Sequence, residues 1–194
     1  MTFAELLRRR LNESADIKRA TARDGALLAV LDECAKVMTQ CIRDGGTIFF
    51  CGNGGSATDA EHLSAEFLGH FYYDRPSISS ANLSSNMAGM SAIANDYCYE
   101  EVFARQIDAL GRPGDVLVAL STSGNSPNVI AAVEHANEMG LRTVGLTGRT
   151  GGRLASVAEF VFRAPTTDTP RIQECYMTVG HTLCEIVETQ IHPR

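Results

Sequence analysis

Apolar residues in the N-terminal part of the chain recur at helical spacing in two stretches, residues 3–11 and residues 27–42. Steps of three and four residues place such side chains on one face of a helix. Asp24 is a plausible start for the second helix, and Gly45-Gly46 is a plausible stop. We therefore predict two helices before any strand.

From residue 47 onward the pattern changes to short apolar runs, most of them followed by a turn rich in glycine or serine and then by helical spacing. The strand candidates lie at 47–51, 77–83, 115–120, 142–147 and 160–162, of which 77–83 is the weakest. Helical spacing marks 87–93, 102–110 and a long final segment, 171–191. This alternation predicts an α/β fold of βα units around a parallel sheet.

The composition fits a single globular domain. The 194 residues are 44% hydrophobic and 21% charged, which suffices for one sizeable core and excludes disorder. We expect residues 47–194 to form the domain, and the helical segment 1–46 to pack on it or on a partner subunit. Apolar stretches fall far short of the roughly 18 residues that span a bilayer, and the N-terminus lacks a signal-peptide core. We therefore expect a cytoplasmic protein with no membrane partner.

The charge and the cysteines exclude further classes. The net charge of −6 argues against nucleic-acid binding, because a duplex needs a clustered basic face and the 17 lysines and arginines are scattered. The six cysteines form no C-x-x-C pair, so neither a zinc knuckle nor a thioredoxin-like motif is present. We expect reduced, mostly buried thiols. An anionic small molecule held by backbone amides is compatible with this charge.

A glycine-rich turn, Cys51-Gly-Asn-Gly-Gly-Ser-Ala-Thr-Asp59, follows the first strand candidate. We expect its glycines, at 52, 54 and 55, to adopt positive φ and to let a ligand approach the backbone. Ser56 and Asp59 have the spacing of a capping box for the next helix. The free amides and the dipole at such a helix start favour phosphate or a polarised oxygen.

The same letters, Gly52-x-Gly54-x-x-Ala57, also match the dinucleotide-binding fingerprint. That fold needs an acidic residue about 20 positions later, at the end of the second strand, to bind a ribose. Residues 77–86 contain no Asp or Glu, and Asp74 precedes the strand candidate. We therefore expect no nucleotide cofactor. The other alternative to an anion site is a tight turn without a ligand.

A second turn, Ser121-Thr-Ser-Gly-Asn-Ser-Pro127, directly follows the strand candidate at 115–120. Ser126 at the cap and Pro127 in the first helical position predict a helix start there. The hydroxyls of this turn and the amides of the helix start could bind phosphate without any Lys or Arg. An ordinary Ser/Thr/Gly connection is the alternative, but the preceding strand and the proline favour phosphate.

His62 and Glu66 lie four residues apart on the helix that follows the first turn, so their side chains share one face. Such a pair can bind one metal ion or can place a general base beside a partner that tunes it. The alternative is a solvated surface pair, which is common at this spacing. The position just after a ligand turn favours a functional role.

The last helix carries Gln173 and His181, with Thr169-Pro170 as its predicted cap and first-turn pair. His181 stands in an otherwise apolar stretch, where a lone histidine is more often a satisfied core residue than a catalyst. Eight helical residues rise about 12 Å. One metal ion could therefore hardly bind both side chains from a single regular helix.

In chain order these motifs resemble those of the phosphoheptose isomerases, a family of sugar isomerase (SIS) domains. The likeness covers almost the whole chain and rests on 51–57 with Asp59, His62 and Glu66, on Asn95-Asp96-Tyr97, on 121–126, and on Arg171-Ile-Gln-Glu174 with His181. It implies one SIS domain with a doubly wound, flavodoxin-like sheet in three layers. It also implies conversion of sedoheptulose 7-phosphate to D-glycero-D-manno-heptose 7-phosphate, feeding bacterial heptose synthesis, by a homotetramer with interface active sites.

The resemblance further implies roles for individual residues. Glu66 would be the base that moves a proton between C1 and C2, and His181 the acid/base for the oxygen protons. The phosphate would be held by Ser121, Thr122, Ser123 and Ser126. The sugar site would be lined by Asn53, Gly54, Gly55, Glu66, Asn95, Asp96 and Gln173. Zinc would be bound by His62, Glu66, Gln173 and His181.

The chain departs from the family pattern at two positions. Tyr176 stands where many relatives have a histidine, and Cys98 stands where they usually have glycine. Two rival functions keep the same core: a non-catalytic tetramer that binds the bacterial replication initiator, and a sugar-phosphate sensor. The first resembles a protein with Asn in place of His181, and the second would not need the Glu/His pair. The presence of both Glu66 and His181 favours the enzyme.

Overall fold

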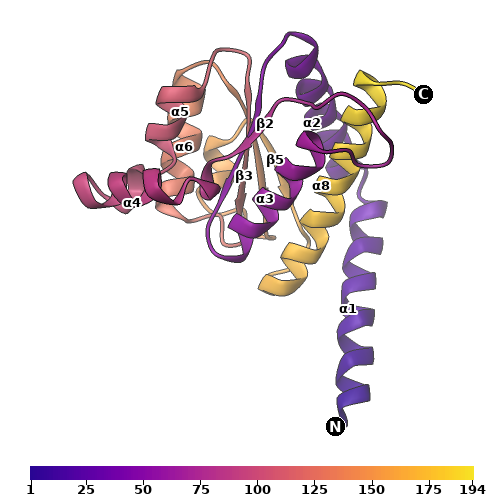
Figure 1. The fold of residues 1–194 in the computed structure, drawn as a ribbon. Coiled ribbons are helices and arrows are strands. Elements are labelled where there is room, and N and C mark those ends of the chain that lie inside the picture. The colour runs from indigo at the N-terminus through magenta and orange to yellow at the C-terminus, as the bar shows by residue number, and fades with distance from the viewer.

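The computed structural model describes residues 1–194 as one α/β unit (Figure 1). The strands are β1 Ile48–Gly52, β2 Ser80–Asn82, β3 Val116–Ser121, β4 Arg142–Thr147 and β5 Phe160–Arg163. The helices are α1 Phe3–Arg23, α2 Gly25–Arg43, α3 Gly55–Leu68, α4 Met87–Asp96, α5 Ala104–Leu110, α6 Pro127–Glu138, α7 Leu154–Val157 and α8 Thr169–Ile191. Two short 3-10 helices, η1 Leu83–Ser85 and η2 Tyr99–Glu101, complete the secondary structure. None of the helices combines the length and the apolar character that crossing a bilayer requires.

All neighbouring strands pair in parallel, in the order β2-β1-β3-β4-β5. This order confirms the predicted doubly wound, flavodoxin-like sheet. The chain reverses its winding between β1 and β3, because α3 follows β1 onto one face of the sheet and α6 follows β3 onto the other (Figure 1). The carboxyl ends of β1 and β3 therefore flank the crevice where ligands bind in such sheets.

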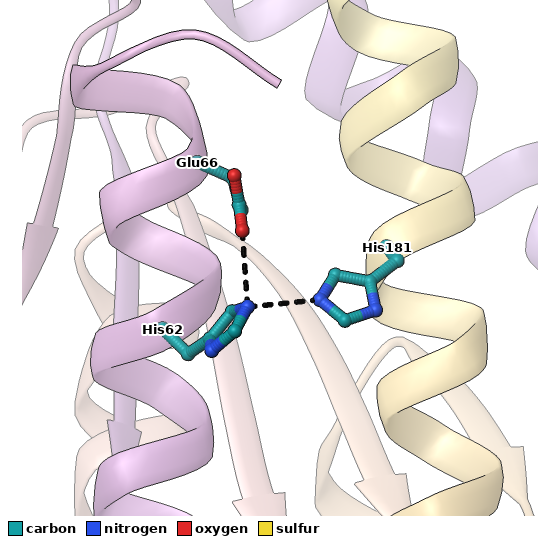
Figure 2. Close-up of side chains that lie close together, drawn as sticks. All are labelled: His62, Glu66 and His181. Atoms are coloured by element: carbon teal, nitrogen blue, oxygen red, sulfur yellow. Dashed lines mark hydrogen bonds and ion pairs between the residues drawn. The ribbon is translucent and has the colours of Figure 1, made fainter. Parts of the chain in front are cut away.

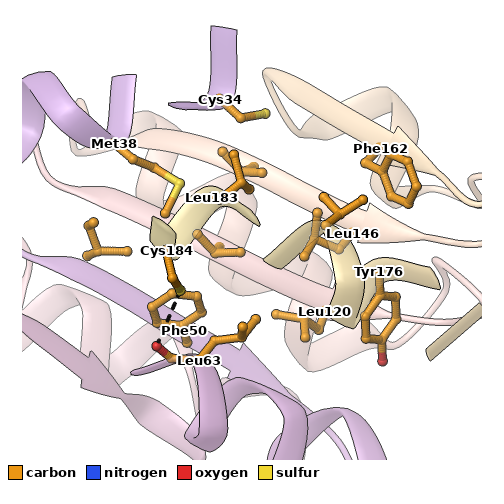
Figure 3. Packing of buried hydrophobic residues seen from close by; sticks show 14 of the residues in the cluster. Cys34, Met38, Phe50, Leu63, Leu120, Leu146, Phe162, Tyr176, Leu183 and Cys184 are labelled. Carbon is orange, nitrogen blue, oxygen red and sulfur yellow. Dashed lines mark hydrogen bonds between the residues drawn. The ribbon is translucent and has the colours of Figure 1, made fainter. Parts of the chain in front are cut away.

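Each face of the sheet carries its own hydrophobic core. Successive residues of a strand point to opposite faces, so Phe50 of β1 belongs to one core and Phe49 and Cys51 belong to the other. In the first core, side chains of α2, α3 and α8 meet those of the central strands (Figure 3). In the second core, α5 and α6 pack on the sheet. The result is the predicted arrangement of three layers.

The N-terminal segment forms two helices that meet at Asp24, as predicted. The Asp24 carboxylate caps α2 by accepting the backbone N–H of Ala26 at 3.0 Å and of Leu27 at 3.1 Å. α2 buries Cys34 and Met38 in the first core. α1 contacts α8 near its own C-terminal end, where Thr21 Oγ1 lies 3.4 Å from Cys175 Sγ. The rest of α1 extends away from the body of the molecule (Figure 1).

Two predicted element ends are wrong. Thr169 is the first residue of α8 rather than its cap; Asp168 occupies the N-cap position, and its side chain makes no capping hydrogen bond. The strand candidate at 77–83 shortens to Ser80–Asn82, because only these residues pair with β1 at the edge of the sheet. Leu83 instead starts a 3-10 turn.

Candidate active site

The first glycine turn links β1 to α3 with close backbone contacts. Gly54, the N-cap of α3, has φ +55°, a conformation that glycine adopts without a Cβ penalty. The expected positive φ at Gly52 and Gly55 is wrong. A Cβ on Gly52 would lie 2.6 Å from the carbonyl oxygen of Ser56, and one on Gly55 would lie 2.7 Å from Nε2 of Gln173. At both positions glycine is required because a Cβ would clash with these atoms, and not because the backbone has a positive φ.

Ser56 and Asp59 form no capping box, because α3 has no side-chain cap. Their side chains turn toward α8 instead. Ser56 Oγ lies 2.8 Å from the hydroxyl of Tyr176, which donates to Asp59 Oδ2 at 3.1 Å. The same carboxylate oxygen accepts a hydrogen bond from Gln173 Nε2 at 2.8 Å. Burial raises the pKa of Tyr176, so its hydroxyl keeps its proton and remains a donor.

The second turn places hydroxyls at the carboxyl end of β3, next to the start of α6. Ser126 occupies the N-cap position without a capping hydrogen bond, and its Oγ lies 3.0 Å from Oγ of buried Ser121. Ser123 is exposed and its Oγ accepts the N–H of Asn125 at 3.1 Å. Thr122 is half-buried. At the start of α6, Pro127 has no N–H and the Val129 N–H donates to Ser126 O and to Asn128 Oδ1, so the Asn128 N–H is the one left for an anion.

A glycine turn between β4 and α7, which contains Gly151 and Gly152, packs against the second turn; we call it the third turn. Gly124 has φ +68°, and a Cβ there would lie 2.0 Å from the carbonyl oxygen of Gly151. The carbonyl of Gly124 in turn accepts the N–H of Leu154 at 2.9 Å. Two turns of the chain therefore meet backbone to backbone, which holds the hydroxyl-bearing segment in place.

Two asparagines join the first and second turns across the crevice. Asn53 Nδ2 donates to Asn128 Oδ1 at 2.8 Å, and Asn128 Nδ2 donates to Asn53 Oδ1 at 2.9 Å. Tyr99 adds a hydrogen bond from its hydroxyl to Asn53 Oδ1 at 3.0 Å. The segment from α4 to η2 is thereby held at the same end of the sheet.

His62 and Glu66 of α3 face His181 of α8 (Figure 2). His62 Nε2 lies 3.0 Å from Glu66 Oε1 and 3.1 Å from His181 Nε2. Gly180 permits this approach, because a Cβ there would lie 2.6 Å from Cδ1 of Leu63 on α3. The hypothesis that His181 is a satisfied core residue is wrong: its side chain reaches the surface of the α3–α8 contact beside a second imidazole.

The surroundings of His181 lower its pKa and so favour the neutral imidazole. Burial lowers its pKa, the neighbouring His62 lowers it further, and Glu66 acts in the opposite direction. Phe71 stacks on the His181 ring, with centroids 5.7 Å apart and planes inclined by 20°. A neutral imidazole can either donate or accept a proton, which is the property that acid/base chemistry needs.

The structure places the remaining predicted site residues less centrally. Asn95 and Asp96 are exposed at the end of α4, where Asn95 Nδ2 donates to Asp96 Oδ1 at 2.9 Å. Gln173 lies on the first glycine turn, with its amide directed to Asp59. Cys98 is exposed and is the N-cap of η2. The chain thus brings together His62, Glu66 and His181, while Gln173 belongs to a separate hydrogen-bond network.

Comparison with known proteins identifies the family to which the chain belongs. The SIS domain model matches residues 13–148 of the chain. The phosphoheptose isomerase of Akkermansia muciniphila is 44% identical over 190 residues, which cover 98% of this chain and 99% of that protein. The chain belongs to the phosphoheptose isomerase family. A phosphoheptose isomerase from Desulfovibrio desulfuricans is 47% identical over 188 residues, 92% of this chain and 90% of the relative.

Solved phosphoheptose isomerases share the whole fold. The protein from Neisseria gonorrhoeae matches with a TM-score of 0.90 at 37% identity, covering 97% of this chain and 100% of that chain. The protein from Francisella tularensis matches with a TM-score of 0.92 at 33% identity and the same coverage.

The sequence of this phosphoheptose isomerase family member did not predict every residue of the candidate site. It did not assign Asn128 or Tyr99, and it noted Tyr176 only as a departure from the family pattern. Their partners are distant in the chain, so no local spacing connects them. One signal was present: Gly180 interrupts an apolar helical stretch directly before His181, and such a glycine often marks a close helix contact.

Proposed function

We propose that this chain is an aldose–ketose isomerase that interconverts sedoheptulose 7-phosphate and D-glycero-D-manno-heptose 7-phosphate. The observation that carries the proposal is the convergence of the Glu66 carboxylate and the His181 imidazole between α3 and α8, together with a hydroxyl-rich helix start at the carboxyl end of β3. The similarity to named phosphoheptose isomerases over nearly the whole chain supports this choice of substrate.

The sugar phosphate binds at the second turn. Ser121, Thr122, Ser123 and Ser126 supply hydroxyls, and the start of α6 supplies the N–H of Asn128 with a favourable helix dipole. These donors need no basic side chain, so a chain with a net charge of −6 can still bind phosphate. Asn53, Gly54 and Gly55 face the sugar from the first turn, and Asn95, Asp96 and Gln173 complete its site.

Glu66 and His181 carry the proton transfers. The Glu66 carboxylate removes a proton from C1 of the ketose while the C2 oxygen gains a proton from the His181 imidazole, which forms an enediol. His181 then takes the proton of the C1 hydroxyl, and Glu66 returns its proton to C2, which gives the aldose. Each group ends the cycle in its starting protonation state. General acid–base catalysis of this kind contributes about 100-fold to 10,000-fold to a rate.

The His62, Glu66 and His181 cluster fits zinc. One ligand atom from each residue lies within 4.8 Å of the other two. His62 Nε2 contacts both Glu66 and His181, and a ring nitrogen cannot donate to one partner and accept from the other at once. Lone pairs that converge in this way suit a cation, and two imidazoles with a carboxylate are typical zinc ligands.

When bound, zinc would act as a Lewis acid that stabilises negative charge on the substrate oxygens. We assign His62, Glu66 and His181 as its ligands. Gln173 is kept as a fourth ligand in the proposal, on the family resemblance.

We further propose a cytoplasmic homotetramer with active sites at subunit interfaces. The exposed apolar side chains of α1 support assembly: Phe3 is 95% exposed, and Leu7 and Leu11 are each 62% exposed. A stripe of this kind on an extended helix is typical of an interaction surface. Six free cysteines, five of them buried, suit a reducing compartment.

The proposed reaction is tested by incubating the zinc-loaded protein with sedoheptulose 7-phosphate in D₂O. We expect formation of the aldose with deuterium at C2, because the carboxylate exchanges its proton with solvent. Unphosphorylated sedoheptulose should react far more slowly, since it lacks the group that the second turn binds. Binding of the sugar phosphate without turnover would reject the isomerase and favour a sensor.

A further inference from the structure

Arg75 and Glu188 form an ion pair that is buried between the C-terminal end of α3 and the last part of α8. Arg75 Nε lies 3.0 Å from Glu188 Oε1, and the two side chains are only 2% and 1% exposed. Desolvation offsets much of the attraction in a buried pair, so such a pair is weak evidence for a purely stabilising role. Its other hydrogen bonds show what the pair holds in place.

Arg75 caps the end of the helix that carries Glu66. Its Nη2 donates to the backbone carbonyl oxygen of Glu66 at 2.8 Å. Its Nη1 donates to the carbonyl oxygens of Phe67 at 2.9 Å and Gly69 at 3.0 Å. The last carbonyls of a helix lack internal partners, and a cation there also favours the helix dipole. The guanidinium therefore fixes the last turn of α3.

Glu188 holds the segment after α3 against α8. Its Oε1 accepts the N–H of Phe71 at 2.8 Å, and its Oε2 accepts the N–H of Tyr72 at 2.9 Å. Glu188 follows His181 by seven residues, which is close to two helical turns, so both side chains leave α8 on the same face. The carboxylate thus connects this face of α8 to residues 71–75.

Phe71 completes the connection to the proposed catalytic group. While Glu188 holds its backbone N–H, its ring lies against the imidazole of His181 with a centroid separation of 5.7 Å and an interplanar angle of 20°. Offset stacking of aromatic rings has a preferred geometry. The ring therefore limits the rotation of the His181 side chain by stacking against the imidazole.

We propose that Arg75, Glu188 and Phe71 are positioning residues for the isomerase reaction. Arg75 fixes Glu66 by binding the backbone carbonyl of Glu66, and Glu188 fixes His181 by holding Phe71, whose ring stacks on the imidazole. We call this set the α3–α8 clamp. The inference rests on the proposed function, because it concerns how the two proton-transferring groups are aligned. None of the three residues touches the substrate in this proposal.

The variants Glu188→Gln and Phe71→Leu test the clamp in the zinc-loaded protein. We expect each to lower kcat by about tenfold or more, because displacement of a catalytic group by about 1 Å can cost about 100-fold. KM should change little, since the contacts of Phe71 and Glu188 do not include the phosphate turn on the β3–α6 connection. Phe71→Tyr keeps the ring and should retain kcat close to that of the unmodified chain.

Asp115→Asn is the matched control. Asp115 is also a buried carboxylate that accepts two backbone N–H groups, from Thr47 and Arg112, both at 2.8 Å. It lies just before β3, and its hydrogen bonds go to the segments before β1 and β3 rather than to α3, α8 or residues 71–75. We expect this variant to lose stability and to keep kcat at temperatures where far-UV circular dichroism shows it folded.

Amide hydrogen exchange gives a second readout that needs no turnover. In Glu188→Gln, amides of residues 66–72 should exchange faster while those of residues 55–60 remain unchanged. If the unmodified chain converts no sedoheptulose 7-phosphate, the proposed function fails and the exchange pattern still tests the mechanical part of the clamp.

Three outcomes would overturn the inference. The first is that kcat falls no more in Glu188→Gln than in Asp115→Asn when both variants have lost the same unfolding free energy. The second is full kcat in Phe71→Leu, a half-buried position whose replacement leaves the buried pair intact. The third is unchanged exchange of residues 66–72 in Glu188→Gln. If Glu188→Gln does not fold, the comparison of Phe71→Leu with Phe71→Tyr decides.

Discussion

Glu66 is the single residue on which the proposed chemistry depends most. Its side chain is 23% exposed, and its carboxylate contacts His62 at 3.0 Å. Replacing it in Glu66→Gln removes the base but retains the shape. We expect kcat to fall by about 100-fold or more, the range for a lost general base, with the fold intact. Steady-state kinetics with sedoheptulose 7-phosphate, with zinc content measured alongside, checks this expectation.

Glu61→Gln on the same helix provides the control for Glu66→Gln. Glu61 is exposed and accepts a hydrogen bond from Ser85 Oγ at 3.1 Å, away from the histidine pair. It should keep full kcat. An equal loss in both variants would mean that charge on α3, rather than a positioned base, supports the reaction.

Glu188 also predicts how stability depends on pH. Burial by itself raises its pKa, but hydrogen bonds from the backbone of Phe71 and Tyr72 and from Arg75 outweigh burial, so the pKa lies below its ordinary value. A carboxyl with a lowered folded-state pKa adds stability above its unfolded pKa and loses it as the pH falls through the folded value. Unfolding free energy should therefore decrease below about pH 4.3, the unperturbed value for glutamate.

Urea titrations between pH 3 and pH 7 measure this dependence. Glu188→Gln should show a shallower loss of unfolding free energy at acid pH than the unmodified chain, because the titrating group is gone. Parallel curves for the two proteins would show that other carboxylates dominate acid unfolding.

At the residue scale, local spacing predicts only part of the site. His62 and Glu66 are four residues apart on one helix, so their contact follows from helical geometry. His181 is more than a hundred positions away, and its approach depends on Gly180 packing against Leu63. The turn of Ser56 toward Tyr176 likewise depends on where α8 lies, which no pattern within α3 contains.

At the element scale, the periodic segments were predictable and their ends less so. The buried strand β3 alternates between the two cores, and its apolar character is continuous in the sequence from Val116 to Leu120. β2 is shorter than the strand predicted at 77–83. It lies at the edge of the sheet, and only residues 80–82 pair with β1. Helix starts depend on which side chain reaches the free amides, and at α3 none does.

The backbone contact between the second and third turns leads to a prediction about Gly124. Gly124→Ala should weaken binding of inorganic phosphate and lower the unfolding free energy, because the new Cβ meets Gly151 and the φ of +68° is unfavourable. A left-handed conformation alone costs a non-glycine residue about 1–2 kcal/mol. Isothermal titration calorimetry and thermal unfolding measure the two effects.

Gly45→Ala separates the effect of an unfavourable φ from the effect of the contact with Gly151. Gly45 lies at the end of α2 and has φ +79°, but a Cβ there would have no atom within 4 Å. It should lose only the conformational part of the stability and keep phosphate affinity. Equal phosphate affinity in both variants would show that the Gly124–Gly151 contact does not support the binding turn.

At the scale of the whole molecule, strand order decides which turns meet. The chain order of the strands predicts a parallel sheet, but the β2-β1-β3 arrangement places the turns after β1 and β3 side by side. The reciprocal bonds of Asn53 and Asn128 occur only because of that neighbour relation. Since strand order is a property of the folded chain, this pair could not be predicted from either motif alone.

The exposed stripe on α1 leads to a prediction about assembly. Leu7→Glu combined with Leu11→Glu should reduce the native mass measured by light scattering from a multiple of the 20.9 kDa chain toward the single chain. Both leucines are 62% exposed in the isolated chain, so the change should not unfold it. Charges are poorly tolerated where an apolar surface becomes buried between subunits.

Asn12→Glu on the exposed polar side of α1 should leave the native mass unchanged. A mass equal to one chain for the unmodified protein would contradict the proposed tetramer directly.

The backbone contact between the second and third turns also bears on attempts to alter substrate range by directed evolution. A Cβ on Gly124 would meet the carbonyl of Gly151, and a Cβ on Gly152 would meet the carbonyl of Gly124, so single-site libraries at Gly124 or Gly152 should return mostly inactive clones. Thr122 and Ser123 of the same turn supply hydroxyls to the phosphate in the proposed function, so they should be kept as well. Diversity aimed at new phosphorylated sugars is therefore best introduced at Asn95 and Asp96, which are exposed at the end of α4, with the glycine contact left untouched.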